Sequence, residues 1–333
     1  MKKTATYLPL LGIALASGLW AQGGDPSYKP KRINKMIELM EAGQPVYDLS
    51  VVGAGYEEGK KLAKSHIDFI QYQMEHGPFV PNRLREFMQG LVDGGPTKSG
   101  HRTPAVIVTL PVLGLDGPTV RANHWVIEQV LSSGVHGLML CHARTPEAVK
   151  MFIAAARYPF SRDGLKDDMI PEGLRGSGSQ SFAARIWGVS SNKYLEVADP
   201  WPLNPEGELI LSIKVEDKHA LANVEQTTAV PGVAWGEWGP GDMTMSLMGL
   251  NRPRGGSAQA TGPGGMPALG APILEEARTR VFDAFKANDK RILHGTTIDN
   301  IEELIKWGVM VTHGPTEELT NKGRKFTKRE MAY

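Results

Sequence analysis

The chain of 333 residues has a single cysteine, Cys141, and almost no excess charge, with 37 Lys and Arg against 36 Asp and Glu. One cysteine excludes an intrachain disulfide, so the packing of the core must supply the stability. A net charge of +1 leaves no basic surplus for a phosphate backbone, which argues against nucleic acid as a partner. Neither a GxGxxG nor a P-loop pattern follows the first expected strand, which weakens a nucleotide-binding interpretation.

Long apolar runs are confined to the N-terminus. Lys2 and Lys3 precede a mostly apolar stretch at residues 7–20, and Ala21 fits the position before a cleavage point. This layout predicts a secretory signal peptide over residues 1–21, because the apolar part is short for a membrane span. A retained anchor or a misassigned start is the alternative. We therefore expect a periplasmic or secreted protein that has no contact with the membrane once the signal is removed.

Beyond that segment, 41% hydrophobic residues provide for a sizeable core, and apolar β-rich runs alternate with amphipathic helical patterns. Such alternation predicts a parallel sheet covered by helices. Eight strand candidates favour a closed (β/α)8 TIM barrel over an open doubly wound sheet, and we treat residues 22–333 as one domain. The predicted strands are 45–52, 68–75, 105–112, 137–142, 208–216, 232–238, 291–295 and 308–314. The predicted helices are 82–92, 121–134, 145–158, 218–230 and 272–288.

Two segments break this alternation. Residues 159–207 contain a Gly/Ser-rich turn and a Pro-rich approach to the next strand. Residues 251–271 are rich in Gly and Pro and predict an irregular loop. This loop follows Asp242 closely, so it is either a surface insertion or a lid over the site.

Two acids occur where neighbouring strands end. Glu216 ends one predicted strand, and Asp242 follows the next, directly after Gly239-Pro240-Gly241. Because the active site of a parallel barrel lies at the C-terminal ends of its strands, both carboxylates can enter one mouth. Such oxygen ligands suit Mg²⁺, Mn²⁺ or a similar divalent ion. The alternative is a helix-capping Asp and an unrelated Glu.

Three segments match the motifs of one known family, in the expected order. The segment latest in the chain is LILSIKVEDKHALANVEQTTAVPGVAWGEWGPGDM. The middle segment comprises TPEAVKMFIAAARYP and GLRGSGSQSFAARIWG, and the earliest is QMEHGPF. They resemble, respectively, the metal-binding core, the central Arg-Gly-rich segment and the Glu-His motif of the HpcH/HpaI aldolase / citrate lyase family. The match runs through most of residues 33–327.

The resemblance implies a (β/α)8 barrel of the phosphoenolpyruvate/pyruvate type. It also implies a divalent-metal-dependent lyase that stabilises the enolate of a small 2-oxo or hydroxy acid and makes or breaks a carbon–carbon bond. Mg²⁺ or Mn²⁺ would be the ion, with Co²⁺ or Zn²⁺ as alternatives. Family members often form trimers or hexamers in which the C-terminal helix is exchanged between subunits.

By position in these motifs, the resemblance assigns roles to single residues. Glu216 and Asp242 would be the metal ligands, and His76 would move a proton. The backbone amides at Gly241 and Asp242 would hold the substrate carboxylate. A structural role for His76 is the alternative, because a histidine at a strand end is more often structural than catalytic.

Other side chains are candidates for substrate contact. His142 ends the fourth predicted strand and could supply a metal ligand or an acid/base group, or could bond to backbone at the rim. Arg175 and Gln180 lie in the Arg-Gly-rich segment and either line the site or pack the loop.

Three positions depart from the family pattern. Thr109 stands where the family has an oxyanion-stabilising Arg, Lys214 where it has Gln, and Gln73 where an acid orients the histidine. These changes leave two alternatives open beside the lyase, namely a carboxylate-binding protein without turnover and a different reaction on the same enolate.

Lys214 shares a strand face with Glu216, because residues two apart on a strand point to the same side. It could form a buried ion pair, replace the missing Arg as the cation near the oxyanion, or act as a Schiff-base amine. We favour the second role, then the first.

Overall fold

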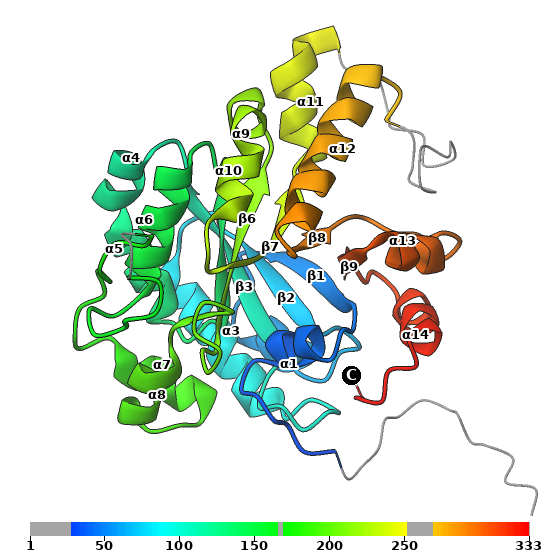
Figure 1. Ribbon diagram of the computed structural model, residues 1–333. Helices are drawn as coiled ribbons and strands as arrows, with labels where there is room; N and C mark the ends of the chain where they lie inside the picture. The colour runs from blue at the N-terminus through cyan, green and yellow to red at the C-terminus, as the bar shows by residue number, and fades with distance from the viewer. Residues whose placement is uncertain (1–27, 166–168, 252–268, 333) are drawn as a thin grey trace, which may run out of the picture.

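The computed structural model describes residues 28–165, 169–251 and 269–332 and shows a closed barrel of eight parallel strands (Figure 1). The neighbour order is β4-β3-β2-β1-β9-β8-β7-β6, and pairing of β4 with β6 closes the ring. The barrel strands are β1 Val46–Val52, β2 Phe69–Gln73, β3 Ala105–Leu113, β4 Gly137–Cys141, β6 Leu209–Val215, β7 Val233–Trp238, β8 Arg291–Leu293 and β9 Val309–His313. A two-residue strand, β5 Pro200–Trp201, pairs with the start of β6. Each predicted strand range thus matches one barrel strand, with β3 ending one residue beyond its predicted range, and the predicted fold class is confirmed.

Helix α1 precedes β1 and lies at one end of the barrel, and the other helices lie outside the ring between and after the strands in sequence (Figure 1). They are α1 Lys35–Glu41, α2 Tyr56–Leu62, α3 Pro81–Gly94, α4 Gly117–Ala122, α5 His124–Leu131, α6 Pro146–Ala156, α7 Gln180–Trp187, α8 Ser191–Val197, α9 Lys218–Ala222, α10 Val224–Ala229, α11 Pro240–Met248, α12 Pro272–Ala287, α13 Ile301–Trp307 and α14 Glu317–Phe326. A 3₁₀ turn, η2 Gly249–Asn251, follows α11.

Two predicted helices are each divided in the structure. The predicted helix 121–134 becomes α4 and α5, which meet at Asn123, and the predicted helix 218–230 becomes α9 and α10, which meet at Asn223. Asp116 and Asp217 cap α4 and α9 through their side chains. The asparagines have a non-helical ψ near zero, which turns the chain without a wide loop.

The barrel interior is apolar near the N-terminal ends of the strands, which we call the base, and polar near the C-terminal ends, which we call the mouth. A buried cluster that includes Phe69, Ile107 and Trp235 fills the lower interior, and α1 packs beneath it. Two residues further along two of these strands, Thr109 and Glu237 replace the apolar side chains. Because side chains alternate along a strand, these residues share the inner face. The alternation along β3 and β7 therefore places polar side chains at the mouth.

The C-terminal helix α14 packs against its own barrel. Leu319 joins a buried cluster with Tyr47, Ile301 and Ile305. Within the single chain, this contact covers the outside of β1. The predicted exchange of the last helix between subunits stays a prediction.

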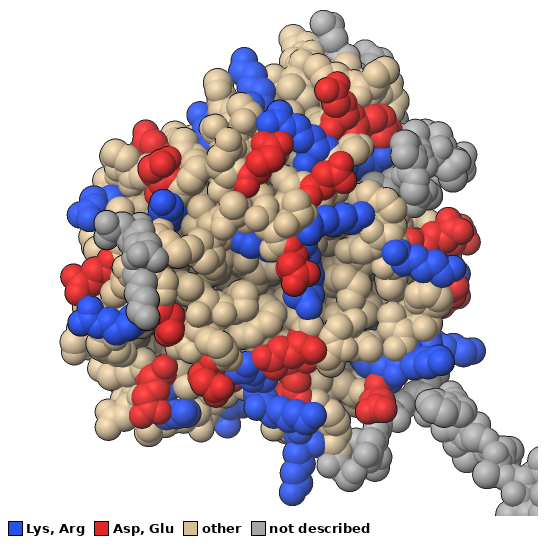
Figure 2. All heavy atoms as spheres, viewed as in Figure 1, with Lys and Arg blue, Asp and Glu red and all other residues tan. Residues whose placement is uncertain are grey.

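Some predictions lie on residues that the structure does not describe. The predicted signal peptide at residues 1–21 is outside the described ranges, and so are residues 252–268 of the predicted loop. Among the described residues, no helix has both the length and the apolar character that a bilayer span requires. Figure 2 shows acidic and basic side chains interspersed on the visible face, in keeping with the near-zero net charge.

Candidate metal centre

Four side chains at the mouth converge on one point. They are Glu75 after β2, His142 after β4, Glu216 after β6 and Asp242 in the first turn of α11. Each offers one ligand atom, and these atoms all lie within 4.8 Å of one another. The two acids expected from the sequence are therefore brought together, and two further side chains join them. Three carboxylates and one imidazole form a donor set that suits a divalent ion.

The glycine before α11 makes room for this arrangement. A Cβ atom at Gly239 would lie 2.5 Å from both Cβ and Oε2 of Glu216, so only glycine fits there. The Glu216 side chain is fully buried, and its Oε1 accepts the His142 backbone N–H at 3.0 Å. Close approach of the β7–α11 turn thus places Asp242 beside a buried carboxylate.

Lys214 bridges two of the acids. Its Nζ lies 2.9 Å from Glu216 Oε2 and 3.1 Å from Glu75 Oε2. Burial lowers the pKa of Lys214, but the nearby Glu237 and Glu216 carboxylates outweigh this effect and leave its pKa above the ordinary value. A strongly protonated amine is a poor Schiff-base nucleophile, so the geometry favours the ion-pair interpretation.

The two bridged carboxylates have different electrostatic environments. Burial raises the pKa of Glu216, although Lys214 opposes the rise. Burial acts in the same direction on Glu75, but Lys214 outweighs it and leaves the pKa of Glu75 below the ordinary value. Glu75 Oε1 is buried and has no partner at hydrogen-bonding geometry among the described residues, and the Cys141 thiol beside this carboxyl also lowers its pKa. A buried carboxylate oxygen without a partner, beside a second acid, can be neutralised by a divalent metal ion. These residues therefore fit the metal that the family resemblance implies.

His142 is oriented by a neighbouring acid. Its Nδ1 lies 2.8 Å from Asp217 Oδ2, while Nε2 lies 3.7 Å from Glu216 Oε1 and 3.8 Å from Glu75 Oε1. The hydrogen bond with Asp217 raises the pKa of His142, with burial opposing it. The sequence left the role of His142 open, and the structure places it in the cluster.

His76 lies at the edge of the same cluster. Its side chain is 59% exposed, and Nε2 lies 3.3 Å from Glu75 Oε2. Two of the departures from the family pattern, Thr109 and Gln73, contact each other: the Thr109 hydroxyl donates to Gln73 Oε1 at 2.8 Å. A neutral hydrogen-bonded pair therefore occupies the positions where the family has a cation and an acid.

A second acid–base group at the mouth was not predicted from the sequence. His313 at the end of β9 contacts Asp48 of β1, with Nδ1 2.7 Å from Oδ1. Burial lowers the pKa of His313, but Asp48 outweighs it and raises the pKa to about 9. Burial also raises the pKa of nearby Glu237 on β7. The sequence does place an acid and a histidine at inward-facing strand positions. Because 265 residues separate Asp48 from His313, sequence spacing could not show that they meet.

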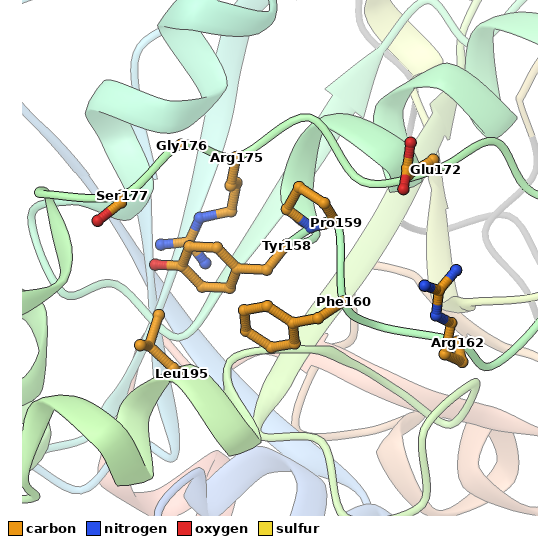
Figure 3. A pocket seen from close by; sticks show the side chains of 9 residues that line it. All are labelled: Tyr158, Pro159, Phe160, Arg162, Glu172, Arg175, Gly176, Ser177 and Leu195. Carbon is orange, nitrogen blue, oxygen red and sulfur yellow. The ribbon is translucent and has the colours of Figure 1, made fainter.

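The structure does not bring Arg175 and Gln180 to this cluster. The N–H of Leu174, which precedes Arg175, donates to the carbonyl of Ala154 at the end of α6, and α6 begins at the mouth side. The segment between α6 and α7 therefore runs back along α6, and Arg175 lies away from the mouth. There its guanidinium stacks over the Tyr158 ring at 4.2 Å beside an open hollow of about 610 Å³ (Figure 3). Gln180, at the start of α7, accepts the N–H of Gly178.

Comparison with known proteins finds curated aldolases to which the chain is similar. It is 29% identical over 207 residues to a hydroxypyruvate/pyruvate aldolase of Cupriavidus necator, covering 62% of this chain and 64% of that protein. A hydroxypyruvate/pyruvate aldolase of Sagittula stellata is 25% identical over 273 residues, with 82% and 86% covered. A 2-keto-3-deoxy-L-rhamnonate aldolase of Klebsiella pneumoniae is 32% identical over 185 residues, with 56% of each chain covered. The match thus spans less than two thirds of the first of these relatives. No protein-family model matches the chain.

Solved structures agree on the fold. An HpcH/HpaI aldolase/citrate lyase family protein of Burkholderia cenocepacia has a TM-score of 0.62 at 19% identity, covering 89% of this chain and 98% of that one. An HpcH/HpaI aldolase of Desulfitobacterium hafniense has a TM-score of 0.58 at 17% identity, with 88% and 95% covered. The chain is therefore a homologue of hydroxypyruvate/pyruvate and 2-keto-3-deoxy-L-rhamnonate aldolases, with the (β/α)8 barrel of HpcH/HpaI proteins.

Proposed function

We propose that this protein is a metal-dependent carbon–carbon lyase that acts on a small 2-oxo or hydroxy acid. The observation that carries the proposal is the convergence of three carboxylates and one imidazole at the barrel mouth, with a buried Glu75 oxygen that has no partner at hydrogen-bonding geometry among the described residues. The names of the curated relatives, which are aldolases, support the reaction class.

Binding of the substrate carboxylate is assigned to the start of α11. The amides of Gly241 and Asp242 precede the first hydrogen bond of this helix, from the Met243 N–H to the Gly239 carbonyl. A Cβ atom at Gly241 would meet nothing within 4 Å, so the space beside these amides is open. Amides at a helix N-terminus attract negative charge. A 2-oxo acid would lie there with its carbonyl oxygen toward the four-residue cluster.

A divalent cation held by Glu75, His142, Glu216 and Asp242 would polarise that carbonyl and stabilise negative charge on its oxygen. Lys214 adds a positive charge beside these acids, with its Nζ 2.9 Å from Glu216 Oε2. His76 is exposed and lies beside Glu75, so it can exchange a proton with solvent as the bond is made or broken.

A coupled assay tests this function. The protein is incubated with Mg²⁺, Mn²⁺ or Co²⁺ and a panel of 4-hydroxy-2-oxo acids, and released pyruvate is measured. We expect turnover that Glu216→Ala and Asp242→Ala abolish. Glu225→Ala serves as the matched control, because Glu225 is an exposed acid paired with Arg280. Turnover that survives both cluster variants would refute the proposal.

One observation favours a second candidate, a carboxylate-binding protein without turnover. The Thr109–Gln73 hydrogen bond puts an uncharged pair where the family pattern has a cation and an acid. Under this alternative, the protein binds pyruvate in the presence of metal, and calorimetry detects that binding, but no substrate of the panel is cleaved.

Secretion and self-association are also proposed. The charged and apolar pattern of residues 1–21 supports export to the periplasm or medium, which cell fractionation tests. Recovery of the uncleaved chain in the cytoplasm would contradict it. A homo-oligomer that exchanges α14 would appear in light scattering as a trimer or hexamer, whereas a monomer would contradict it.

A further inference from the structure

We propose that His142 is a nitrogen ligand of the mouth centre, that Asp217 holds it in the ligand position, and that the centre therefore selects a first-row transition metal ion over Mg²⁺. This inference rests on the proposed function only for the presence of a metal at the mouth. It does not depend on which reaction is catalysed.

The two ring nitrogens of His142 face different partners. Nδ1 contacts Asp217 Oδ2 at 2.8 Å, whereas Nε2 faces Glu216 Oε1 at 3.7 Å and Glu75 Oε1 at 3.8 Å. An aspartate next to Nδ1 favours the tautomer that carries the proton there and leaves the Nε2 lone pair for a metal. The separations from both carboxylates are long for hydrogen bonds and leave space for an ion between these atoms.

Asp217 is itself fixed on both carboxylate oxygens. Oδ1 accepts the backbone N–H groups of His219 and Ala220 at 2.8 and 2.9 Å and so caps α9. Oδ2 accepts Arg144 Nε at 2.9 Å in addition to its contact with His142. The acid that orients the imidazole is thus anchored to a helix start and to a guanidinium. This carboxylate–histidine arrangement is the usual support of metal-bound histidine.

The backbone also holds His142 in place. Its φ of 49° lies in the left-handed region, which non-glycine residues adopt infrequently. Two hydrogen bonds maintain this turn, from the His142 N–H to Glu216 Oε1 at 3.0 Å and from the Ala143 N–H to the Lys214 carbonyl at 3.1 Å. Such conformations cluster at functional sites, because the surrounding structure must enforce them. Here the enforced turn directs the imidazole into the cluster of acids.

The donor set decides between metals. Mg²⁺ prefers an all-oxygen octahedral shell and keeps several waters, whereas imidazole suits later first-row ions. Glu75, Glu216 and Asp242 supply oxygen, and His142 supplies the one nitrogen. We therefore expect Co²⁺ and Zn²⁺ to bind more tightly than Mg²⁺ by about 100-fold or more, in line with the general order of metal affinities.

Electron paramagnetic resonance tests the nitrogen ligand directly. The purified protein, stripped of metal, receives one equivalent of Cu²⁺, and pulsed spectra are examined for the ¹⁴N modulation of a coordinated imidazole. We expect this signal in the unmodified protein and its loss in His142→Asn, a substitution that tolerates the left-handed backbone. His124→Ala is the matched control, since this half-buried histidine lies outside the four-residue cluster and its Nδ1 contacts the Arg121 carbonyl. An unchanged signal in His142→Asn, or a signal lost only in His76→Ala, would overturn the proposal.

Calorimetric titration tests the role of Asp217 and the choice of metal. Asp217→Asn keeps an oxygen to cap α9 but removes the acceptor for the imidazole, so we expect Co²⁺ affinity to fall by about 10–100-fold. Asp116→Asn is the matched control, because Asp116 caps α4 in the same way without a histidine partner. Equal loss in both variants, or equal affinity for Mg²⁺ and Co²⁺ in the unmodified protein, would contradict the inference. A nitrogen-ligated metal without pyruvate release would refute the lyase but leave this inference standing.

Discussion

The two ends of the barrel both contain buried charge, but in opposite balance. At the base, the single carboxylate of Asp68 contacts Lys35 at 3.1 Å, Arg329 at 2.9 Å and Arg324 at 3.4 Å. At the mouth, Lys214 contacts Glu75 at 3.1 Å and Glu216 at 2.9 Å, and Asp242 adds a third carboxylate to the cluster. Cations are therefore in excess around Asp68, whereas acids are in excess in the mouth cluster.

The pKa shifts follow this difference. Burial opposes ionisation of Asp68, but Arg329 and Lys35 outweigh it and hold the pKa of Asp68 well below the ordinary value. At the mouth, burial raises the pKa of Glu216, whereas Lys214 keeps the pKa of Glu75 below the ordinary value. An acid that its neighbours fully neutralise serves the fold, whereas an acid that stays under-neutralised can accept a cation. The comparison thus distinguishes a structural ion cluster from a binding site made of the same residue types.

The largest expected effect is on the base. Asp68→Asn leaves three buried cations without their carboxylate, so we expect a loss of about 3–5 kcal/mol in the free energy of unfolding. Denaturant titration measures this loss. Asp299→Asn, at an exposed position, is the control and should change stability by less than about 0.5 kcal/mol. If the two variants unfold alike, the base cluster is not structural.

At the mouth, Gly239→Ala should be the most damaging small change. Its Cβ would lie 2.5 Å from Glu216, so the turn must shift, at a cost of about 1–3 kcal/mol in stability. We also expect weaker Co²⁺ binding in calorimetry. Gly241→Ala is the matched control, because its Cβ would meet nothing within 4 Å. Equal Co²⁺ affinity in the two variants would contradict the role assigned to Gly239.

Lys214→Met should change the balance of charge at the mouth directly. Without the ammonium group, Glu75 and Glu216 lose their shared cation, so the metal-free protein should become less stable. Metal affinity should rise by about tenfold, because a competing positive charge beside the ligands is removed. Thermal unfolding with and without Co²⁺ measures both effects. Unchanged affinity would show that Lys214 and the ion do not share these acids.

The smallest expected effect is the pH dependence of the His313–Asp48 pair. Because the pKa of His313 is raised from the ordinary 6.5 to about 9, its stabilising contribution is complete below pH 6.5 and disappears as the pH rises through 9. The imidazole is 44% exposed, so solvent screening limits the contribution to about 1 kcal/mol. The difference in unfolding free energy between the unmodified protein and His313→Asn should therefore shrink between pH 6 and pH 10. A difference that grows over this range would reverse the sign and refute the pair.

Much of the fold and part of the site could be predicted from sequence. Strands such as β6 and β7 are short apolar runs bounded by turn residues, and that local pattern survives folding. Glu216 and Asp242 were found because Glu216 ends one such run and Asp242 follows the short turn after the next. Short helices such as α13, with seven residues, were missed because too few turns are present for a periodic pattern to emerge.

Other contacts could not be predicted, because they depend on side chains that meet only after the barrel closes. Glu75 lies beside His76 in the predicted motif, yet nothing local indicates which of the two enters the cluster. Arg175 was expected near the site, but the path of the chain along α6 carries it away. The direction of a connection is a property of packing, which sequence spacing does not encode.

The sequence by itself determined the barrel and the two acids at adjacent strand ends, because strand periodicity and turn residues act over a few neighbouring positions. Only the tertiary structure decided that Asp217 orients His142, that Lys214 bridges Glu75 and Glu216, and that Asp48 meets His313. The physical reason is that closing a ring of parallel strands gathers one end of every strand at the same mouth, whatever their separation along the chain.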